Sequence, residues 1–118
     1  MQRTDGEGRQ PIDQHTIFHI ARAADWAAAQ ADGSYRMSTR GRTLEDVGYI
    51  HCSLDHQVDA VAEAHYRDVA DLVLLAIDPA RVDAEVRYER LDGAPEPFPH
   101  IYGPLRVDAV VAVSPFPR

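Results

Sequence analysis

The sequence predicts an α+β fold with six or seven short strands and two helices, both helices in the first half of the chain. Strand-forming runs of β-branched and aromatic residues recur along all 118 residues, whereas helix-forming stretches end near residue 68. Strands and helices do not alternate regularly, so a doubly wound parallel sheet is not expected. We expect residues 15–118 to form one domain and the polar residues 1–14 to form a disordered tail.

The first part of the chain supplies a strand, a helix and a loop. Residues 16–21 (Thr-Ile-Phe-His-Ile-Ala) are β-branched and aromatic and predict a strand. Residues 22–31 are rich in helix formers, and Gly33 stands where a C-terminal cap belongs. A short strand is expected near 34–37. Residues 38–47 have no clear pattern, which indicates an exposed loop with room for one helical turn.

The middle of the chain predicts a second strand, an amphipathic helix and a buried strand. Residues 49–53 (Tyr-Ile-His-Cys-Ser) form the strand. From residue 54 to about residue 68, apolar residues recur at helical spacing along one face. The run Leu-Val-Leu-Leu-Ala-Ile within residues 71–78 is the most apolar in the chain and is typical of a central, buried strand.

The last part of the chain predicts three strands around a rigid loop. Residues 86–90 read as a half-exposed strand, and residues 91–99 form a loop that contains three prolines. Residues 100–102 and 107–113 are two final strands, separated by a Gly-Pro pair.

Composition narrows the classes of function. The formal net charge of −7 argues against general nucleic-acid binding, because phosphate backbones are bound by basic surfaces. Arg36, Arg40 and Arg42 are the local exception, and we interpret them as part of a solvated loop. Cys52 is the only cysteine and is expected in the core. No apolar run approaches the ~18 residues of a membrane span, so we expect a cytoplasmic protein without a membrane partner.

Three histidines lie inside apolar, strand-like segments: His19, His51 and His100. A buried imidazole needs partners for a donor and an acceptor, and leaving either one unpaired costs roughly 1–3 kcal/mol. Each of the three could bond to local backbone, as buried polar groups usually do. Alternatively, they converge in one polar cleft that binds a ligand. We predict the convergence.

Other polar residues share the faces of these histidines, because side chains alternate across a strand. Tyr49 and Ser53 lie on the face of His51, and Tyr102 lies on the face of His100. A metal site built from the three histidines is a further alternative. No His-x-His or His-Glu-x-x-His spacing supports it, so no metal ligand is assigned.

Four segments of the sequence resemble the signature blocks of domain of unknown function family 952. They begin at residues 17, 49, 72 and 98 and read Ile-Phe-His-Ile, Tyr-Ile-His-Cys-Ser, Leu-Val-Leu-Leu-Ala-Ile-Asp and Phe-Pro-His-Ile-Tyr-Gly-Pro-Leu. The resemblance covers about residues 16–114. It implies a fold similar to that of the ADP-ribosyltransferases, in which two small antiparallel sheets are split around a cleft for NAD.

The resemblance also implies residues that bind the cofactor. In that superfamily a His or Arg of the first strand contacts a ribose hydroxyl of NAD, a role that His19 could fill. A motif of Ser, Tyr or His follows on a strand of the second sheet. Its matches here are Tyr49, His51 and Ser53, and Tyr102 joins them as a binding residue from the late strand.

The superfamily usually carries a late-strand glutamate that stabilises the oxocarbenium-like ribosyl centre. This sequence has His100 and Tyr102 in that block, with Glu89 nearby as a substitute. We therefore expect NAD or a related nucleotide as the small-molecule partner. The resemblance leaves contact of Arg36, Arg40 and Arg42 with its pyrophosphate as the alternative to a solvated loop. The expected catalytic residues, for transfer or hydrolysis at a glycosidic carbon, are His51, His100 and Glu89. Two alternatives stay open: a non-catalytic module that binds a small ligand or a protein in the same cleft, and a metal-dependent hydrolase.

Overall fold

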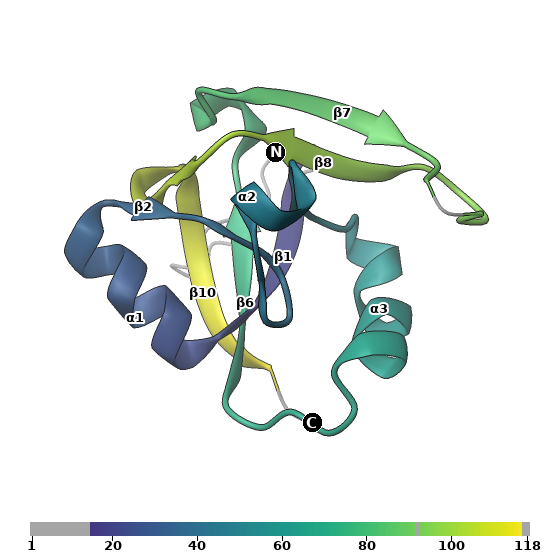
Figure 1. Cartoon of the computed structure of the whole chain (residues 1–118), viewed down its shortest axis with the longest axis horizontal. Coiled ribbons are helices and arrows are strands. Elements are labelled where there is room, and N and C mark those ends of the chain that lie inside the picture. The colour runs from purple at the N-terminus through teal and green to yellow at the C-terminus, as the bar shows by residue number, and fades with distance from the viewer. Residues whose placement is uncertain (1–14, 92, 117–118) are drawn as a thin grey trace, which may run out of the picture.

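The structure, a computed structural model, describes residues 15–91 and 93–116, so the expected tail over residues 1–14 lies outside the described residues. It contains two three-stranded sheets and two two-stranded sheets, and every strand pair is antiparallel. The α-helices of the described part are α1 (Ala23–Asp32), α2 (Leu44–Val47) and α3 (Val58–His65). The α+β fold class predicted from the sequence is confirmed (Figure 1). The expected two helices and six or seven strands are a correction, since the described residues form three α-helices and ten strands, several of only two residues.

One three-stranded sheet runs through the centre of the molecule in the order β1-β6-β10 (Figure 1). Its strands are β1 (Ile17–Arg22), β6 (Leu72–Ile77) and β10 (Val110–Phe116). Strand β6 pairs with both neighbours and is the central strand. Its sequence is nearly continuously apolar because its side chains pack into apolar cores on both faces of the sheet. The prediction of a central strand at this run is confirmed.

Two apolar cores lie on the two faces of this sheet. Ile17 and Ala21 of β1 belong to one core, where Trp26 of α1 also lies. Phe18 and Ile20 belong to the other core, together with buried residues of α3. Because side chains alternate along β1, helices α1 and α3 cover opposite faces of the sheet (Figure 1).

The second three-stranded sheet has the order β5-β8-β7. Its strands are β5 (Ile50–His51), β8 (Phe98–Tyr102) and β7 (Glu85–Glu89). In the register, His100 on the central strand lies opposite His51 on one side and Arg87 on the other. Polar residues of three strands are therefore brought together on one face.

Backbone hydrogen bonds join the two three-stranded sheets. The N–H of Phe18 donates to the carbonyl of Ser53 at 2.8 Å, and the N–H of Ser53 donates back at 2.7 Å. The N–H of Cys52 donates to the carbonyl of Pro99 at 3.0 Å. Cys52 and Ile50 are buried in the core, as the alternation along this strand predicts.

Residues 38–47 contain the helical turn for which the prediction left room, but the exposed loop expected there is wrong, because part of this segment forms a hairpin. Strand β3 (Met37–Thr39) pairs with β4 (Arg42–Thr43), and Gly41 adopts a φ of 70° in the turn between them. Helix α2 follows directly, capped at its start by a hydrogen bond from the N–H of Asp46 to the hydroxyl of Thr43. This segment is not simply exposed, since Ser38 and Leu44 are buried.

Several element ends also differ from the prediction. Helix α3 is shorter than the expected 54–68, because residues Asp55–Gln57 form a 3-10 turn and Tyr66 leaves the helix to enter the core. The last strand begins three residues later than expected, since Val107–Ala109 form a 3-10 turn whose last carbonyl accepts from the N–H of Asp78 at 2.9 Å. Another 3-10 turn spans Pro79–Arg81.

Two short strands complete the described part of the chain. Strand β2 (Ser34–Tyr35) confirms the short strand expected there, and it pairs with β9 (Leu105–Arg106). Within the residues that the structure covers, every helix is too short or too polar to cross a membrane.

Candidate functional site

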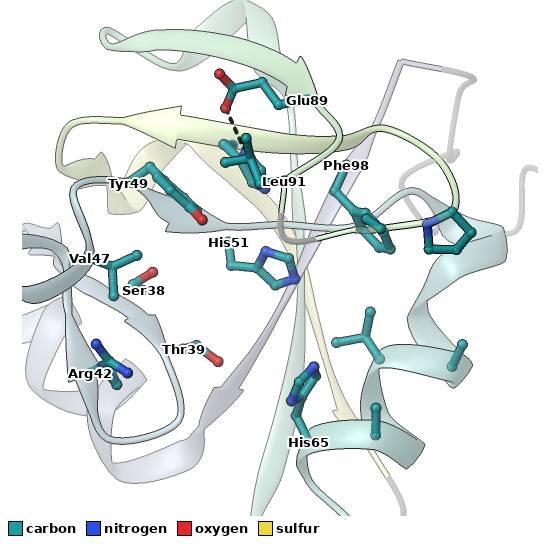
Figure 2. A pocket seen from close by; sticks show the side chains of 16 residues that line it. Ser38, Thr39, Arg42, Val47, Tyr49, His51, His65, Glu89, Leu91 and Phe98 are labelled. Atoms are coloured by element: carbon teal, nitrogen blue, oxygen red, sulfur yellow. Dashed lines mark hydrogen bonds and ion pairs between the residues drawn. The ribbon is translucent and has the colours of Figure 1, made fainter.

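A cavity of about 710 Å³ opens between the β5-β8-β7 sheet, helix α3 and the β3-β4 hairpin (Figure 2). Half of its lining residues are apolar: Val47, Ala60, Val61, Ala64, Leu91, Ala94, Pro95 and Phe98. The other half carry polar or charged groups: Ser38, Thr39, Arg42, Tyr49, His51, His65, Glu89 and His100. An apolar cavity of this size with a few convergent polar groups has the character of a small-molecule site.

A glutamate and a histidine form a pair on the sheet wall of this cavity. Nδ1 of His100 lies 2.8 Å from Oε1 of Glu89, and the hydroxyl of Tyr102 donates to the same oxygen at 2.6 Å. These bonds, that of Tyr102 first and that of His100 second, lower the pKa of Glu89. Glu89 is therefore a carboxylate at neutral pH. The guanidinium of Arg87 lies over the ring of Tyr102, 4.4 Å from its centroid.

The carboxylate of Glu89 determines which nitrogen of neutral His100 carries the proton. Because Nδ1 must donate to the carboxylate, the free electron pair of neutral His100 is on Nε2. An imidazole oriented in this way can take a proton at Nε2 and return it later, as a general base and acid do. The ring is almost fully buried, which shields this chemistry from bulk water.

Aromatic rings pack around His100. The ring of Tyr49 stacks on it, with centroids 4.2 Å apart and an angle of 28° between the planes. The ring of His51 lies 5.4 Å from it and 5.5 Å from the ring of Phe98 (Figure 2). The sheet wall thus offers flat apolar faces beside a proton-transfer group, which suits a planar ligand.

His51 is a neutral imidazole at physiological pH. Burial lowers its pKa to about 4, and the nearby His100, His19 and His65 add to this effect. His51 therefore faces the cavity as a hydrogen-bonding group without charge.

His19 lies behind the cavity wall and is not among the lining residues. Its Nδ1 donates to the carbonyl of His51 at 2.6 Å, so Nε2 accepts from the hydroxyl of Tyr35 at 2.8 Å. Burial lowers the pKa of His19 to about 4, which agrees with this neutral, fully bonded form. The predicted convergence thus brings together His51 and His100, and His19 is the exception, because local partners occupy both of its nitrogens. Its ribose contact stays a prediction that requires these bonds to be exchanged.

The remaining residues predicted from the sequence fall into two groups. Tyr49 and Glu89 line the cavity together with the two histidines. Ser53 and Tyr102 do not line it. Ser53 is buried at the junction with Phe18, and Tyr102 reaches the site only through its hydrogen bond to Glu89.

The sequence did not single out the hairpin wall of the cavity. Ser38 is fully buried there, and among the described residues its Oγ has no hydrogen-bond partner. Nothing in the local sequence marks this serine, because its burial depends on the hairpin. Thr43 and Asp46, at the spacing of a capping box, were the available signal that residues 38–47 are structured.

The three clustered arginines have different surroundings. Arg36 forms an ion pair with Glu45, and Arg40 forms one with Asp68. Arg42 lines the cavity, and no ion pair involves it in the part of the chain that the structure describes. Arg42 thus remains available to an anion.

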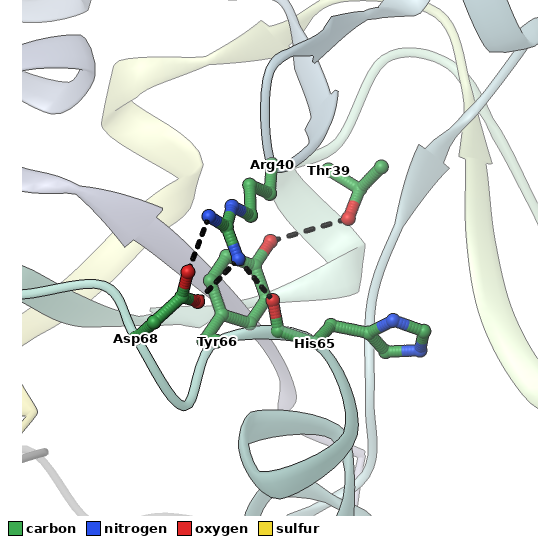
Figure 3. A network of polar contacts seen from close by, with 5 residues as sticks. All are labelled: Thr39, Arg40, His65, Tyr66 and Asp68. Carbon is green, nitrogen blue, oxygen red and sulfur yellow. Dashed lines mark hydrogen bonds and ion pairs between the residues drawn. The ribbon is translucent and has the colours of Figure 1, made fainter.

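A polar network fastens the hairpin to the end of α3 (Figure 3). The guanidinium of Arg40 donates to both carboxylate oxygens of Asp68, at 2.6 and 3.0 Å, and to the carbonyl of His65 at 3.2 Å. Beside it, the hydroxyls of Thr39 and Tyr66 lie 3.2 Å apart. Because helix C-termini carry unpaired carbonyls, an arginine is a suitable partner there. The network holds two walls of the cavity together.

The described residues offer no ready metal centre. Across residues 15–91 and 93–116, no three His, Cys, Asp or Glu side chains are close enough together to hold a metal ion. The alternative of a metal-dependent hydrolase therefore has no ligand cluster in this part of the chain.

Comparison with known proteins places the chain among uncharacterised relatives. A family model described as "Protein of unknown function (DUF952)" matches residues 20–113. The crystal structure of protein CC0527 from Caulobacter crescentus is 31% identical, with a TM-score of 0.73 over 84% of this chain and 83% of that one. A solution NMR structure of CC0527 is 30% identical, with a TM-score of 0.72 over 87% and 85% of the two chains. No curated protein matches the sequence.

Proposed function

The chain belongs to the family of proteins of unknown function DUF952, and we propose that its cavity binds NAD or a related nucleotide for transfer or hydrolysis at a glycosidic carbon. We infer that its two three-stranded sheets correspond to the split sheets of an ADP-ribosyltransferase-like fold. Their antiparallel pairing, their junction at Phe18 and Ser53, and the cavity beside the second sheet support this correspondence.

The Glu89–His100 pair is the observation that carries the proposal. In hydrolysis of NAD, the bond between the ribosyl carbon and nicotinamide breaks, and both electrons leave with the nicotinamide, which becomes neutral. Positive charge then develops on the ribosyl carbon, and the carboxylate of Glu89 stabilises it. Water attacks this carbon while Nε2 of His100 takes the water proton, which yields ADP-ribose.

The surroundings of the pair fit a nucleotide better than a small polar substrate. The faces of Tyr49 and Phe98 suit a planar ring such as nicotinamide or adenine. Neutral His51 can donate to or accept from a hydroxyl or an amide without adding charge beside the developing cation. The cavity volume of about 710 Å³ lies within the range of about 300–1,000 Å³ usual for small-molecule sites.

A non-catalytic binding module is the second candidate, and the position of His19 favours it. The ribose contact expected from the first strand is not offered at the cavity wall, because both ring nitrogens of His19 have partners in the core. In that case the cavity binds a small ligand or a protein without turnover. Binding and turnover must therefore be measured separately.

The experiment combines thermal unfolding with product analysis. We expect NAD or ADP-ribose to raise the melting temperature in the presence of EDTA, since a ligand of the folded state stabilises it by mass action. Chromatography then tests whether nicotinamide is released from NAD. Glu89→Gln and His100→Asn should abolish release.

A second Glu–His pair on the surface supplies the matched control. His56 and Glu96 lie 2.8 Å apart, but both are exposed and neither lines the cavity. His56→Asn and Glu96→Gln should therefore leave nicotinamide release unchanged. Nucleotide binding without release supports the non-catalytic module, and no response to any nucleotide overturns the proposal.

A further inference from the structure

Across the cavity from the Glu89–His100 pair, we propose that Ser38 and Arg42 of the β3-β4 hairpin form a subsite for a phosphate group of the ligand. Both residues line the cavity, and Figure 2 shows both on the hairpin side of it, away from Glu89. This inference rests on the proposed function and narrows it, because it makes the ligand a phosphorylated compound.

Ser38 is the first of the two observations that point to a ligand. The residue is 0% exposed, and in the described part of the chain its Oγ lacks any hydrogen-bond partner. Neighbouring Thr39 differs, because its hydroxyl is bonded to that of Tyr66. A buried hydroxyl without a partner is uncommon, since it gives up its bonds to water on folding. A phosphate oxygen at the cavity wall supplies the acceptor that the Ser38 hydroxyl lacks.

Arg42 supplies the charge. Its neighbours Arg36 and Arg40 are each paired with a carboxylate, whereas Arg42 forms no ion pair with any described residue. The nearby Asp46 interacts with Arg42 only at longer range, and one of its oxygens accepts from the N–H of Thr43. The planar guanidinium of arginine can donate two parallel hydrogen bonds to a phosphate.

The hairpin is held in place before a ligand arrives. Arg40 and Thr39 attach its turn to Asp68, His65 and Tyr66 around the end of α3 (Figure 3). Arg42 therefore approaches a ligand from an ordered wall, and little ordering of the hairpin turn is needed on binding. The fully buried hydroxyl of Ser38 is reached when the cavity side of the hairpin shifts locally around the ligand.

The two subsites determine the orientation of the bound ligand in the cavity. The phosphate end lies at Ser38 and Arg42, and the planar ring and reacting carbon lie against Tyr49, His51 and His100. The substrate class is therefore a phosphorylated ribosyl compound, such as a nucleotide or dinucleotide, rather than a free nucleoside.

Inorganic pyrophosphate is the probe, because it tests the subsite without the rest of a nucleotide. In an NMR titration, pyrophosphate should shift the amide signals of residues 37–43. Arg42→Gln should weaken its binding about tenfold or more, and Ser38→Ala should weaken it severalfold. Ser38→Ala should not lower the melting temperature, because it removes an unpaired hydroxyl. Arg36→Gln, which changes an arginine outside the cavity, is the matched control.

The outcomes separate the subsite from the proposed function. A hairpin response to pyrophosphate that the two variants weaken supports the subsite, even if NAD is not hydrolysed. Nicotinamide release from NAD with the same KM in wild type, Ser38→Ala and Arg42→Gln overturns the subsite and leaves the proposed function standing. Absence of any hairpin response to pyrophosphate in the wild type also overturns the subsite.

Discussion

Nε2 of His19 lies 2.8 Å from the hydroxyl oxygen of Tyr35, and both side chains are buried. Since Nδ1 of the same ring donates to the carbonyl of His51, the hydroxyl of Tyr35 must be the donor in this contact. Two residues from two other segments of the chain, His51 and Tyr35, thus fix one tautomer of His19. The ring serves the packing of the two sheets rather than the cavity.

Tyr35→Phe should destabilise the fold by roughly 1–3 kcal/mol, because it leaves Nε2 of His19 buried without a partner. Urea unfolding at pH 7.5 measures the change. Tyr88→Phe is the control, since Tyr88 is 51% exposed and should cost little. Equal stability of wild type and Tyr35→Phe would contradict a bonded, neutral His19.

The stability of the protein should fall as the pH is lowered from about 6.5 to about 4. The pKa values of His19 and His51 are lowered to about 4 in the folded state, so the unfolded chain binds more protons in this range. The stability that depends on these two histidines staying neutral is fully present above the unfolded pKa of about 6.5. It is lost as the pH falls toward 4, by roughly 3 kcal/mol of unfolding free energy for each histidine. Urea unfolding at several pH values measures it. A flat profile would indicate that neither ring is held neutral.

His51→Ala should separate ligand binding from stability. Its backbone carbonyl, which accepts from His19, is retained in the variant, and the lost ring lines the cavity. We expect the melting temperature to stay nearly unchanged or to rise, because binding groups often reduce stability. The stabilisation by NAD should disappear. His19→Ala is the comparison and should lower the melting temperature strongly; the reverse pattern would assign the ligand to His19.

Tyr102→Phe should raise the pKa of Glu89. The hydroxyl of Tyr102 is the largest cause of the lowered value in the folded protein, and the bond from His100 remains in the variant. NMR titration of the side-chain carboxyl carbon measures the shift, with Tyr88→Phe on the neighbouring position as the control. An unchanged pKa of Glu89 would show that Tyr102 does not position the carboxylate.

Arg40→Gln should loosen the hairpin while leaving the fold nearly intact. The ion pair with Asp68 is exposed, and exposed ion pairs contribute little to the stability of a fold. Hydrogen exchange should become faster over residues 37–43, and affinity for nucleotides should fall. Arg36→Gln removes a comparable surface ion pair and should change neither. Unchanged exchange in Arg40→Gln would mean that the hairpin is held by other contacts.

The strands and the faces on which their side chains lie could be predicted, because both follow from patterns among neighbouring residues in the sequence. The continuous apolar run of β6 reflects the burial of both its faces. Alternation in β5 placed Ile50 in the core and His51 on the opposite face. Glu89 was singled out only as a residue near His100. The antiparallel register of β7 and β8 then brings its carboxylate to Nδ1 of His100.

The hairpin wall and the role of His19 depend on contacts that no local pattern carries. His19 and His51 have similar apolar surroundings in the sequence, but the hydroxyl of Tyr35, 16 residues away, satisfies His19 alone. Ser38 becomes a cavity residue only because Gly41 turns the chain and Arg40 fastens the hairpin to a helix 25 residues further on. Such pairings are set by the tertiary structure.

The junction of the two three-stranded sheets prevents them from moving apart independently. The backbone bonds between Phe18 and Ser53, and the bond from His19 to His51, fasten β1 to the strand that carries part of the cavity wall. Splitting the sheets exposes a buried imidazole and several backbone groups at once, so both sheets open as one cooperative unit. Opening of the cavity to admit a ligand is therefore confined to its other walls, which are the hairpin, helix α3 and the lining residues Leu91, Ala94 and Pro95.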